Sequence, residues 1–155
     1  MDGISIVPTT QVIDMHEHPT KALKEKQDSS IAVGFGYLAK GLVDAFISAG
    51  NTGAVMATAR FLLGTLPSVD RPALAAPFPT ARGKVSVLLD VGATVDSKAT
   101  HLEQFAVMGE IFYRAIFGVK EPRVGLLSNG EEAHKGSDLV RTAHQRLKQL
   151  PLNFI

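Results

Sequence analysis

The sequence predicts an α/β protein with a mostly parallel sheet covered by helices on both faces. Short β-branched or apolar runs alternate with longer amphipathic segments along the 155 residues. Crossover connections of this length join parallel strands, and buried parallel strands carry near-continuous apolar runs. The candidate strands are Ile4–Val7, Ala45–Ser48, Ala73–Phe78, Val85–Asp90 and Val124–Ser128, with an apolar stub at Leu152–Ile155.

Helices are expected between these strands because apolar residues recur there with a period near 3.6. Thr100 to Phe117 has the clearest stripe, and further helices are expected after Gly53 and after Gly136. Ser137 or Asp138 would cap the helix after Gly136. Two shorter helices are predicted from Pro19 to Lys26 and from Ile31 to Leu42, the second capped by Asp28-Ser29.

The length and composition predict one domain. With 45% hydrophobic residues and 20% charged residues, residues 1–155 can bury a single core. A parallel sheet seldom stops on a bare apolar run such as residues 152–155, because an unpaired strand needs neighbours. We therefore expect this single domain to be a fragment of a longer protein, truncated at both ends.

Charge and cysteine content exclude several classes of function. The 16 Lys and Arg residues nearly balance 15 Asp and Glu residues, so a net charge of +1 predicts no nucleic-acid partner. The absence of cysteine excludes disulfides, thiolate metal sites and a catalytic thiol. No basic and apolar leader follows Met1, and the longest uncharged stretch, Ala45 to Ala59, is interrupted by polar residues. A cytoplasmic location is expected.

Three strand-to-helix junctions share one design, in which an apolar strand is followed by a Gly-containing loop and a helix. They begin at Ser48, Asp90 and Ser128. Ligands bind outside the carboxyl ends of parallel strands, so we expect the three loops to converge on one site. The first loop, Gly50-Asn51-Thr52-Gly53, has small residues and amide donors suited to an anion. A tight turn with a helix cap explains this loop equally well.

Standard catalytic and metal motifs are missing from the sequence. It has no G-x-x-x-x-G-K-[ST], G-x-S-x-G or H-E-x-x-H pattern. His16, Glu17 and His18 form a metal-like trio, but a solvated loop before Pro19 is the better interpretation. We expect no metal and no cofactor.

Taken together, the loop motifs resemble the PlsX family of bacterial phosphate acyltransferases of phospholipid synthesis. The resemblance covers nearly the whole chain, in order and with matching spacing. It is carried by residues 48–54, 70–75, 79–80, 88–93, 104–109 and 122–127, and by Gly130, Glu132, Lys135 and Gly136. Members of the family are about twice as long, so the chain resembles their middle portion, with the architecture of isocitrate and isopropylmalate dehydrogenases.

The resemblance implies transfer of a fatty acyl group from acyl-(acyl carrier protein) to inorganic phosphate, which yields acyl phosphate. It also implies a homodimer, with peripheral membrane contact only through segments that this chain lacks. Phosphate is already a nucleophile, so the enzyme must position it against the thioester and stabilise an oxyanion. The catalytic candidates are Asn51, Thr52, Asp90 and Lys135, and the phosphate-binding candidates are Ser48, Gly50, Gly53, Arg71, Gly130 and Glu132.

Two other interpretations stay open at this point. A phosphate acetyltransferase-like or dehydrogenase-like enzyme would use the same architecture, although the loop motifs argue against it. The chain could also be an inactive truncated fragment with a structural or dimerisation role.

Overall fold

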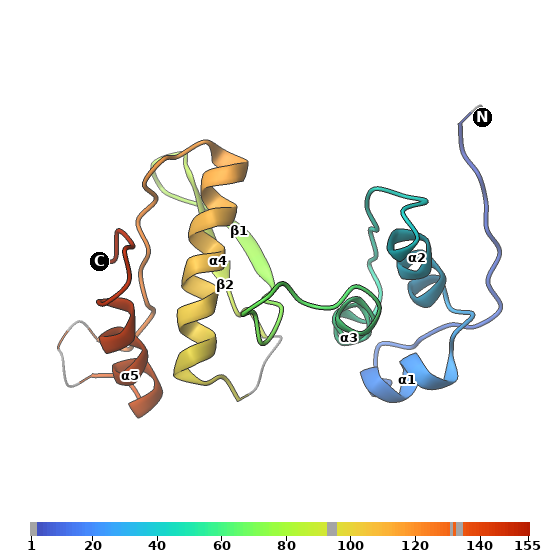
Figure 1. Ribbon diagram of the computed structural model, residues 1–155, viewed down its shortest axis with the longest axis horizontal. Coiled ribbons are helices and arrows are strands. Elements are labelled where there is room, and N and C mark those ends of the chain that lie inside the picture. The colour runs from blue at the N-terminus through green and yellow to red at the C-terminus, as the bar shows by residue number, and fades with distance from the viewer. Residues whose placement is uncertain (1–2, 93–95, 131, 133–134) are drawn as a thin grey trace. The chain divides into compact units, whose positions relative to one another are not determined.

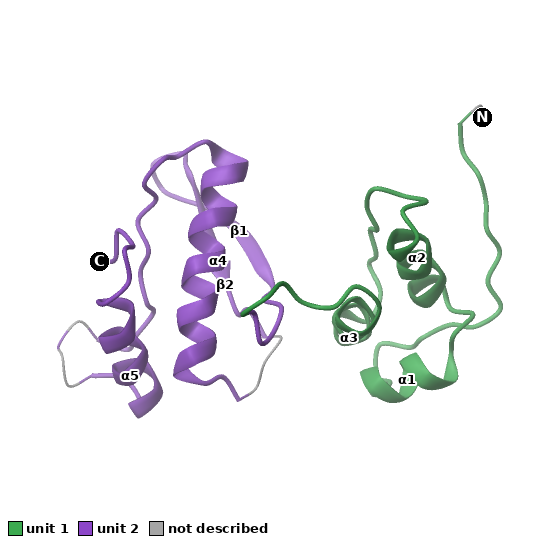
Figure 2. Cartoon of the chain, viewed as in Figure 1, with its two compact units in different colours: residues 1–68 green, residues 69–155 purple. Residues whose placement is uncertain are grey.

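The computed structural model describes residues 3–92, 96–130, 132 and 135–155 of the chain (Figure 1). Five helices and two strands occur in these residues. They are α1 (Pro19–Glu25), α2 (Ser30–Ala39), α3 (Thr52–Leu62), β1 (Ala75–Pro79), β2 (Val85–Leu89), α4 (Ala99–Phe117) and α5 (Asp138–Leu147). The chain forms two compact units, residues 1–68 and residues 69–155, shown in different colours in Figure 2.

The helices of the first unit begin within about two residues of the predicted starts. Pro19 is the first residue of α1, where its missing N–H costs nothing. The Ser29 hydroxyl accepts a hydrogen bond from the Ala32 amide and caps α2. Asn51 caps α3 by accepting from the Ala54 amide at 3.0 Å.

The first unit packs its three helices around a small apolar core. Ile31 and Phe35 of α2 and Ala54 of α3 are its buried members. Phe46 covers this core, with its ring centroid 4.8 Å from that of Phe35. Helix α3 contacts both α1 and α2, so both helices hold it in place.

The second unit contains a hairpin of two antiparallel strands, whereas the sequence predicted a mostly parallel sheet. β1 and β2 are antiparallel, with Ala75 opposite Leu89 and Pro79 opposite Val85. A turn at Thr80 to Gly83 joins them, and the Gly83 amide donates to the Thr80 carbonyl at 3.0 Å. A connection this short can only join antiparallel strands, because parallel strands need a crossover.

Helix α4 packs on the hairpin and on α5. A Cβ on Gly109 would lie 2.8 Å from Leu89, so this glycine lets α4 approach β2 closely. The Tyr113 hydroxyl donates to the Val85 carbonyl at 2.6 Å. On the other side, Leu147 of α5 is buried and α5 lies against α4. Helix α4 ends at Gly118, whose φ of 67° is left-handed.

The remaining predicted strands are not formed in the described residues. Residues 4–7, 45–48 and 125–128 have no strand pairing there. Val124 makes one parallel bridge with Phe154, in which the Val124 amide donates to the Asn153 carbonyl at 2.9 Å. The mixture of helices and strands is therefore confirmed, whereas the larger parallel sheet is not shown.

Candidate functional site

The loop before α3 is held by its own side chains. The Ser48 hydroxyl accepts a hydrogen bond from the Gly50 amide at 3.1 Å, which closes a tight turn. Thr52 is exposed at the first position of α3. The first two amides of a helix have no acceptor within the helix, so those of Thr52 and Gly53 are the donors that this loop can offer an anion.

Asn51 fastens this loop to a distant segment. Its Nδ2 lies 3.0 Å from the carbonyl oxygen of Asp14, 3.2 Å from that of Met15 and 3.1 Å from that of Glu17. The side chain is only 6% exposed. Two amide hydrogens thus face three carbonyls, and neither is directed at a ligand in this arrangement. The catalytic role of Asn51 stays a prediction, and its structural role is now defined.

The segment that Asn51 contacts is closed by an ion pair. The Glu17 carboxylate accepts from the Asp14 amide at 2.8 Å and pairs with Lys26. The hydrogen bond from Lys26, followed by that from the Asp14 amide, lowers the pKa of Glu17 below its ordinary value. The sequence interpretation of residues 16–18 as a solvated loop missed the contact with Asn51, because Asn51 lies more than 30 residues away along the chain.

Gly53 lies against Pro19, the first residue of α1, a contact that the sequence did not predict. We expected its small size to admit a phosphate, but a Cβ at this position would lie 2.6 Å from Cγ of Pro19. The glycine therefore allows α1 and α3 to pack closely. Gly50 is less crowded, since its Cβ would meet Ser48 Oγ at 3.3 Å.

Asp90 follows β2 in a conformation that non-glycine residues rarely adopt. Its φ is 64°, in the left-handed region. Ser97 Oγ donates to Asp90 Oδ2 at 2.6 Å, while Oδ1 is buried without a hydrogen-bond partner among the described residues. Strained backbone and unsatisfied buried oxygens are concentrated at functional sites. Part of the adjoining loop, residues 93–95, lies outside the described residues.

The third loop brings three predicted residues together. A Cβ on Gly130 would lie 2.7 Å from Lys135 Cγ and 2.8 Å from Glu132 Oε2, so both side chains fold over this glycine. The Lys135 amide donates to the Glu132 carbonyl at 2.8 Å. The Lys135 and Glu132 residues are both exposed. Residues 131, 133 and 134 of this loop lie outside the described residues.

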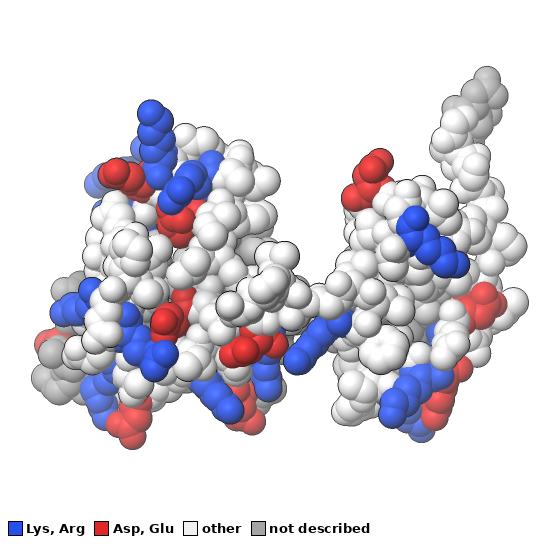
Figure 3. Space-filling model, viewed as in Figure 1, with Lys and Arg blue, Asp and Glu red and all other residues white. Residues whose placement is uncertain are grey.

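The candidates fall into two groups, one in each unit. The first unit holds Ser48, Gly50, Asn51, Thr52 and Gly53, and the second holds Arg71, Asp90, Gly130, Glu132 and Lys135. Each group is described by itself, and the convergence of all three loops stays a prediction. On the face in view, positive and negative side chains are interspersed over the second unit (Figure 3).

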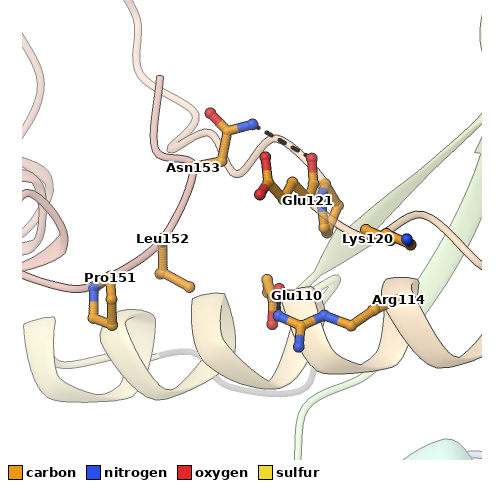
Figure 4. Close-up of a pocket in the computed structure, with 8 residues that line it drawn as sticks. Glu110, Arg114, Lys120, Glu121, Pro151, Leu152 and Asn153 are labelled. Atoms are coloured by element: carbon orange, nitrogen blue, oxygen red, sulfur yellow. Dashed lines mark hydrogen bonds and ion pairs between the residues drawn. The ribbon is translucent and has the colours of Figure 1, made fainter.

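A pocket of about 580 Å³ lies elsewhere in the second unit (Figure 4). Glu110 and Arg114 of α4 form an ion pair on one side of it, and Asn153 donates to the Glu121 carbonyl at 3.4 Å on the other. The remaining lining residues are Lys120, Pro122, Pro151 and Leu152. This lining includes none of the predicted site residues, so the pocket and the candidate site are separate features.

The described residues contain neither a cluster of metal-ligating side chains nor a membrane-spanning helix. In that part of the chain, no group of three or more His, Asp or Glu side chains could hold a metal ion. Nor does any of its helices have both the length and the hydropathy needed to cross a membrane.

Comparisons with known proteins agree with the motifs. A family model described as "Fatty acid synthesis protein" matches residues 2–155. This chain is 52% identical to a curated protein named phosphate acyltransferase from Koribacter versatilis. It is 51% identical to one of the same name from Halothermothrix orenii and 53% identical to one from Acidobacterium capsulatum. The matches cover 96–98% of this chain but 44–45% of those relatives, so the chain spans less than half of their length. The chain belongs to the fatty acid synthesis protein family, the PlsX family of phosphate acyltransferases whose motifs it carries.

Proposed function

We propose that this chain is the central part of a longer phosphate acyltransferase that transfers a fatty acyl group from acyl carrier protein to inorganic phosphate. The observation that carries the proposal is 51–53% identity, over nearly all of the chain, to proteins that are named phosphate acyltransferase. The partners would be the acyl-loaded carrier protein and a second copy of the enzyme. We place the enzyme in the cytoplasm, and its central sheet would be completed by parallel strands from the rest of the protein.

The proposed reaction needs positioning and charge stabilisation. A phosphate oxygen attacks the thioester carbonyl carbon, the C–S bond breaks, and the carrier thiolate leaves and takes up a proton. The products are acyl phosphate and free carrier protein. No step requires an enzyme nucleophile, which is consistent with a chain that has no cysteine. Bringing the two reactants within about 3–3.5 Å of each other supplies a large part of the acceleration.

We assign phosphate binding to the cations Arg71 and Lys135 and to the amides at the start of α3. Glu132 would orient Lys135, since both side chains fold over Gly130. Thr52 is the better candidate to polarise the thioester carbonyl, because it is exposed whereas the Asn51 amide is engaged with three carbonyls. Asp90 would hold the loop after β2 through Ser97.

A full-length test protein can be made by placing this chain in the Koribacter versatilis phosphate acyltransferase in place of the matching segment. We call this protein the grafted enzyme. With acyl carrier protein thioester and inorganic phosphate, it should release free carrier thiol and an acyl phosphate that hydroxylamine traps as a hydroxamate. A folded grafted enzyme that forms neither product, beside an active unmodified relative, would refute the proposal.

A further inference from the structure

The segment that precedes β1 is attached to α4 by two reciprocal hydrogen bonds. The Asp70 backbone amide donates to Gln104 Oε1 at 3.0 Å, and Gln104 Nε2 donates back to Asp70 Oδ2 at 3.0 Å. The two residues are 34 positions apart. The pair therefore fixes a loop residue against a rigid helix.

A second attachment follows four residues later. The Asp90 amide donates to the Leu74 carbonyl at 3.1 Å, which extends the hairpin by one bond. Only residues 71–73 lie between these two attachments. Pro72 also favours an extended backbone at the residue before it. Arg71 is thus held at both ends, at most about 11 Å along the chain from Leu74.

The Arg71 side chain has unused binding capacity. It is partly buried, and it makes no hydrogen bond or ion pair with another described residue. A guanidinium offers five donors in a planar fork that matches two phosphate oxygens. Bidentate binding of this kind requires a fixed guanidinium orientation, so the attachment of the neighbouring residue affects affinity.

We infer that Asp70 and Gln104 are positioning residues that hold Arg71 in place for phosphate, an inference that rests on the proposed function. The pair itself does not touch the substrate. Breaking the Asp70–Gln104 pair does not remove the Arg71 guanidinium, but it lets the Arg71 backbone move. Ground-state phosphate binding then weakens, while the chemical step on bound phosphate is little changed.

The test uses the grafted enzyme with inorganic phosphate as the varied substrate. Gln104→Leu removes both hydrogen bonds without adding charge, and Gln104→Glu sets one carboxylate against another. Each should raise the phosphate KM about five- to thirtyfold with kcat within twofold, as expected when one or two hydrogen bonds of about 1 kcal/mol no longer organise the site. Gln145→Leu makes the same exchange at an exposed position of α5 and should change neither constant.

Rescue separates positioning from a general loss of structure. Adding Asp70→Asn to Gln104→Glu restores the pair with reversed polarity, because the new amide can donate to the new carboxylate. The double variant should return the phosphate KM to within twofold of the unmodified value. Adding Asp70→Asn to Gln104→Leu should give no rescue.

The inference fails if Gln104→Leu leaves the phosphate KM unchanged, or if it lowers the melting temperature and kcat without raising KM. Acyl phosphate formation by the grafted enzyme tests the proposed function itself, and Arg71→Ala distinguishes failure of the positioning inference from failure of the phosphate role assigned to Arg71. If Arg71→Ala weakens calorimetric phosphate binding and Gln104→Leu does not, only the positioning inference is wrong. If Arg71→Ala has no effect on phosphate binding, the phosphate role of Arg71 is wrong as well.

Discussion

Gly53 of α3 packs directly against Pro19 of α1. A Cβ on Gly53 would lie 2.6 Å from the proline Cγ, closer than carbon atoms can approach without displacement. Pro19 is rigid and begins its helix, so it has little freedom to move. The residue that the sequence suggests as part of an anion cradle thus also determines how closely two helices meet.

Gly53→Ala should therefore destabilise the protein despite the higher helix propensity of alanine. We expect a loss of about 1–3 kcal/mol in the free energy of unfolding, because the added methyl group overpacks the contact with Pro19. Urea unfolding of the grafted enzyme measures this loss of stability. The control is Gly36→Ala in α2, where no atom lies within 4 Å of the new Cβ, and a gain of about 0.5–1 kcal/mol is expected. Equal effects at the two positions would contradict the packing argument.

Substitution by aspartate should destabilise the protein more at Asn51 than at an ordinary helix cap. Asn51→Asp keeps the acceptor for the Ala54 amide but removes the donors that face three carbonyls. We expect a loss of about 1–3 kcal/mol in the free energy of unfolding, from carbonyls left unsatisfied. Ser137→Asp at the start of α5 is the matched control and should be nearly neutral, since that side chain only caps.

Kinetic constants of the same variant separate the two roles of Asn51. If Asn51→Asp unfolds like the unmodified protein while kcat falls roughly 10²–10³-fold, the side chain polarises the carbonyl directly. That result would show that the contacts with residues 14–17 are not its main function.

At position 90, a glycine variant should be more stable than an alanine variant, which is the reverse of the usual order. Both Asp90→Ala and Asp90→Gly lose the hydrogen bond from Ser97, but only alanine keeps the cost of a φ of 64°. Asp90→Gly should be more stable than Asp90→Ala by about 1–2 kcal/mol. Ser86 is an exposed residue in β2, and there the Ser86→Ala variant should be more stable than the Ser86→Gly variant. An alanine variant at position 90 that matches or exceeds the glycine variant would show that the loop relaxes freely.

Acid should release the contact between Thr10 and Asp28. The side-chain hydrogen bond from Thr10, followed by that from its backbone amide, lowers the pKa of Asp28 below its ordinary value. The folded state then binds fewer protons than the unfolded state. The contribution to stability is complete above about pH 4 and disappears as the pH falls through the lowered folded pKa.

Thr10→Val should weaken this acid dependence, and Thr10→Ser should preserve it. Urea unfolding of the grafted enzyme between about pH 2.5 and 6 would show the difference as a shallower decline of stability for Thr10→Val. Identical pH profiles for Val and Ser would mean that the hydroxyl contributes nothing to the lowered pKa.

Local signals in the sequence were sufficient for the helices and for the family. The caps Ser29, Asn51 and Ser137 and the stop at Gly118 act within four residues, so a helix end can be identified from its own neighbourhood. The loop motifs are likewise contiguous, so their order and spacing are enough to indicate the family.

Pairing direction and side-chain partners were decided by tertiary structure. β1 and β2 are both recognisable as apolar runs, but only the closed turn between them makes them antiparallel. Asn51 meets Asp14 across 37 residues, and Asp70 meets Gln104 across 34. Contacts at such separations depend on how whole elements pack, which neither local propensity nor hydrophobic period encodes. Helix ends, motifs and family membership follow from local sequence, whereas long-range packing sets which residues each motif residue contacts.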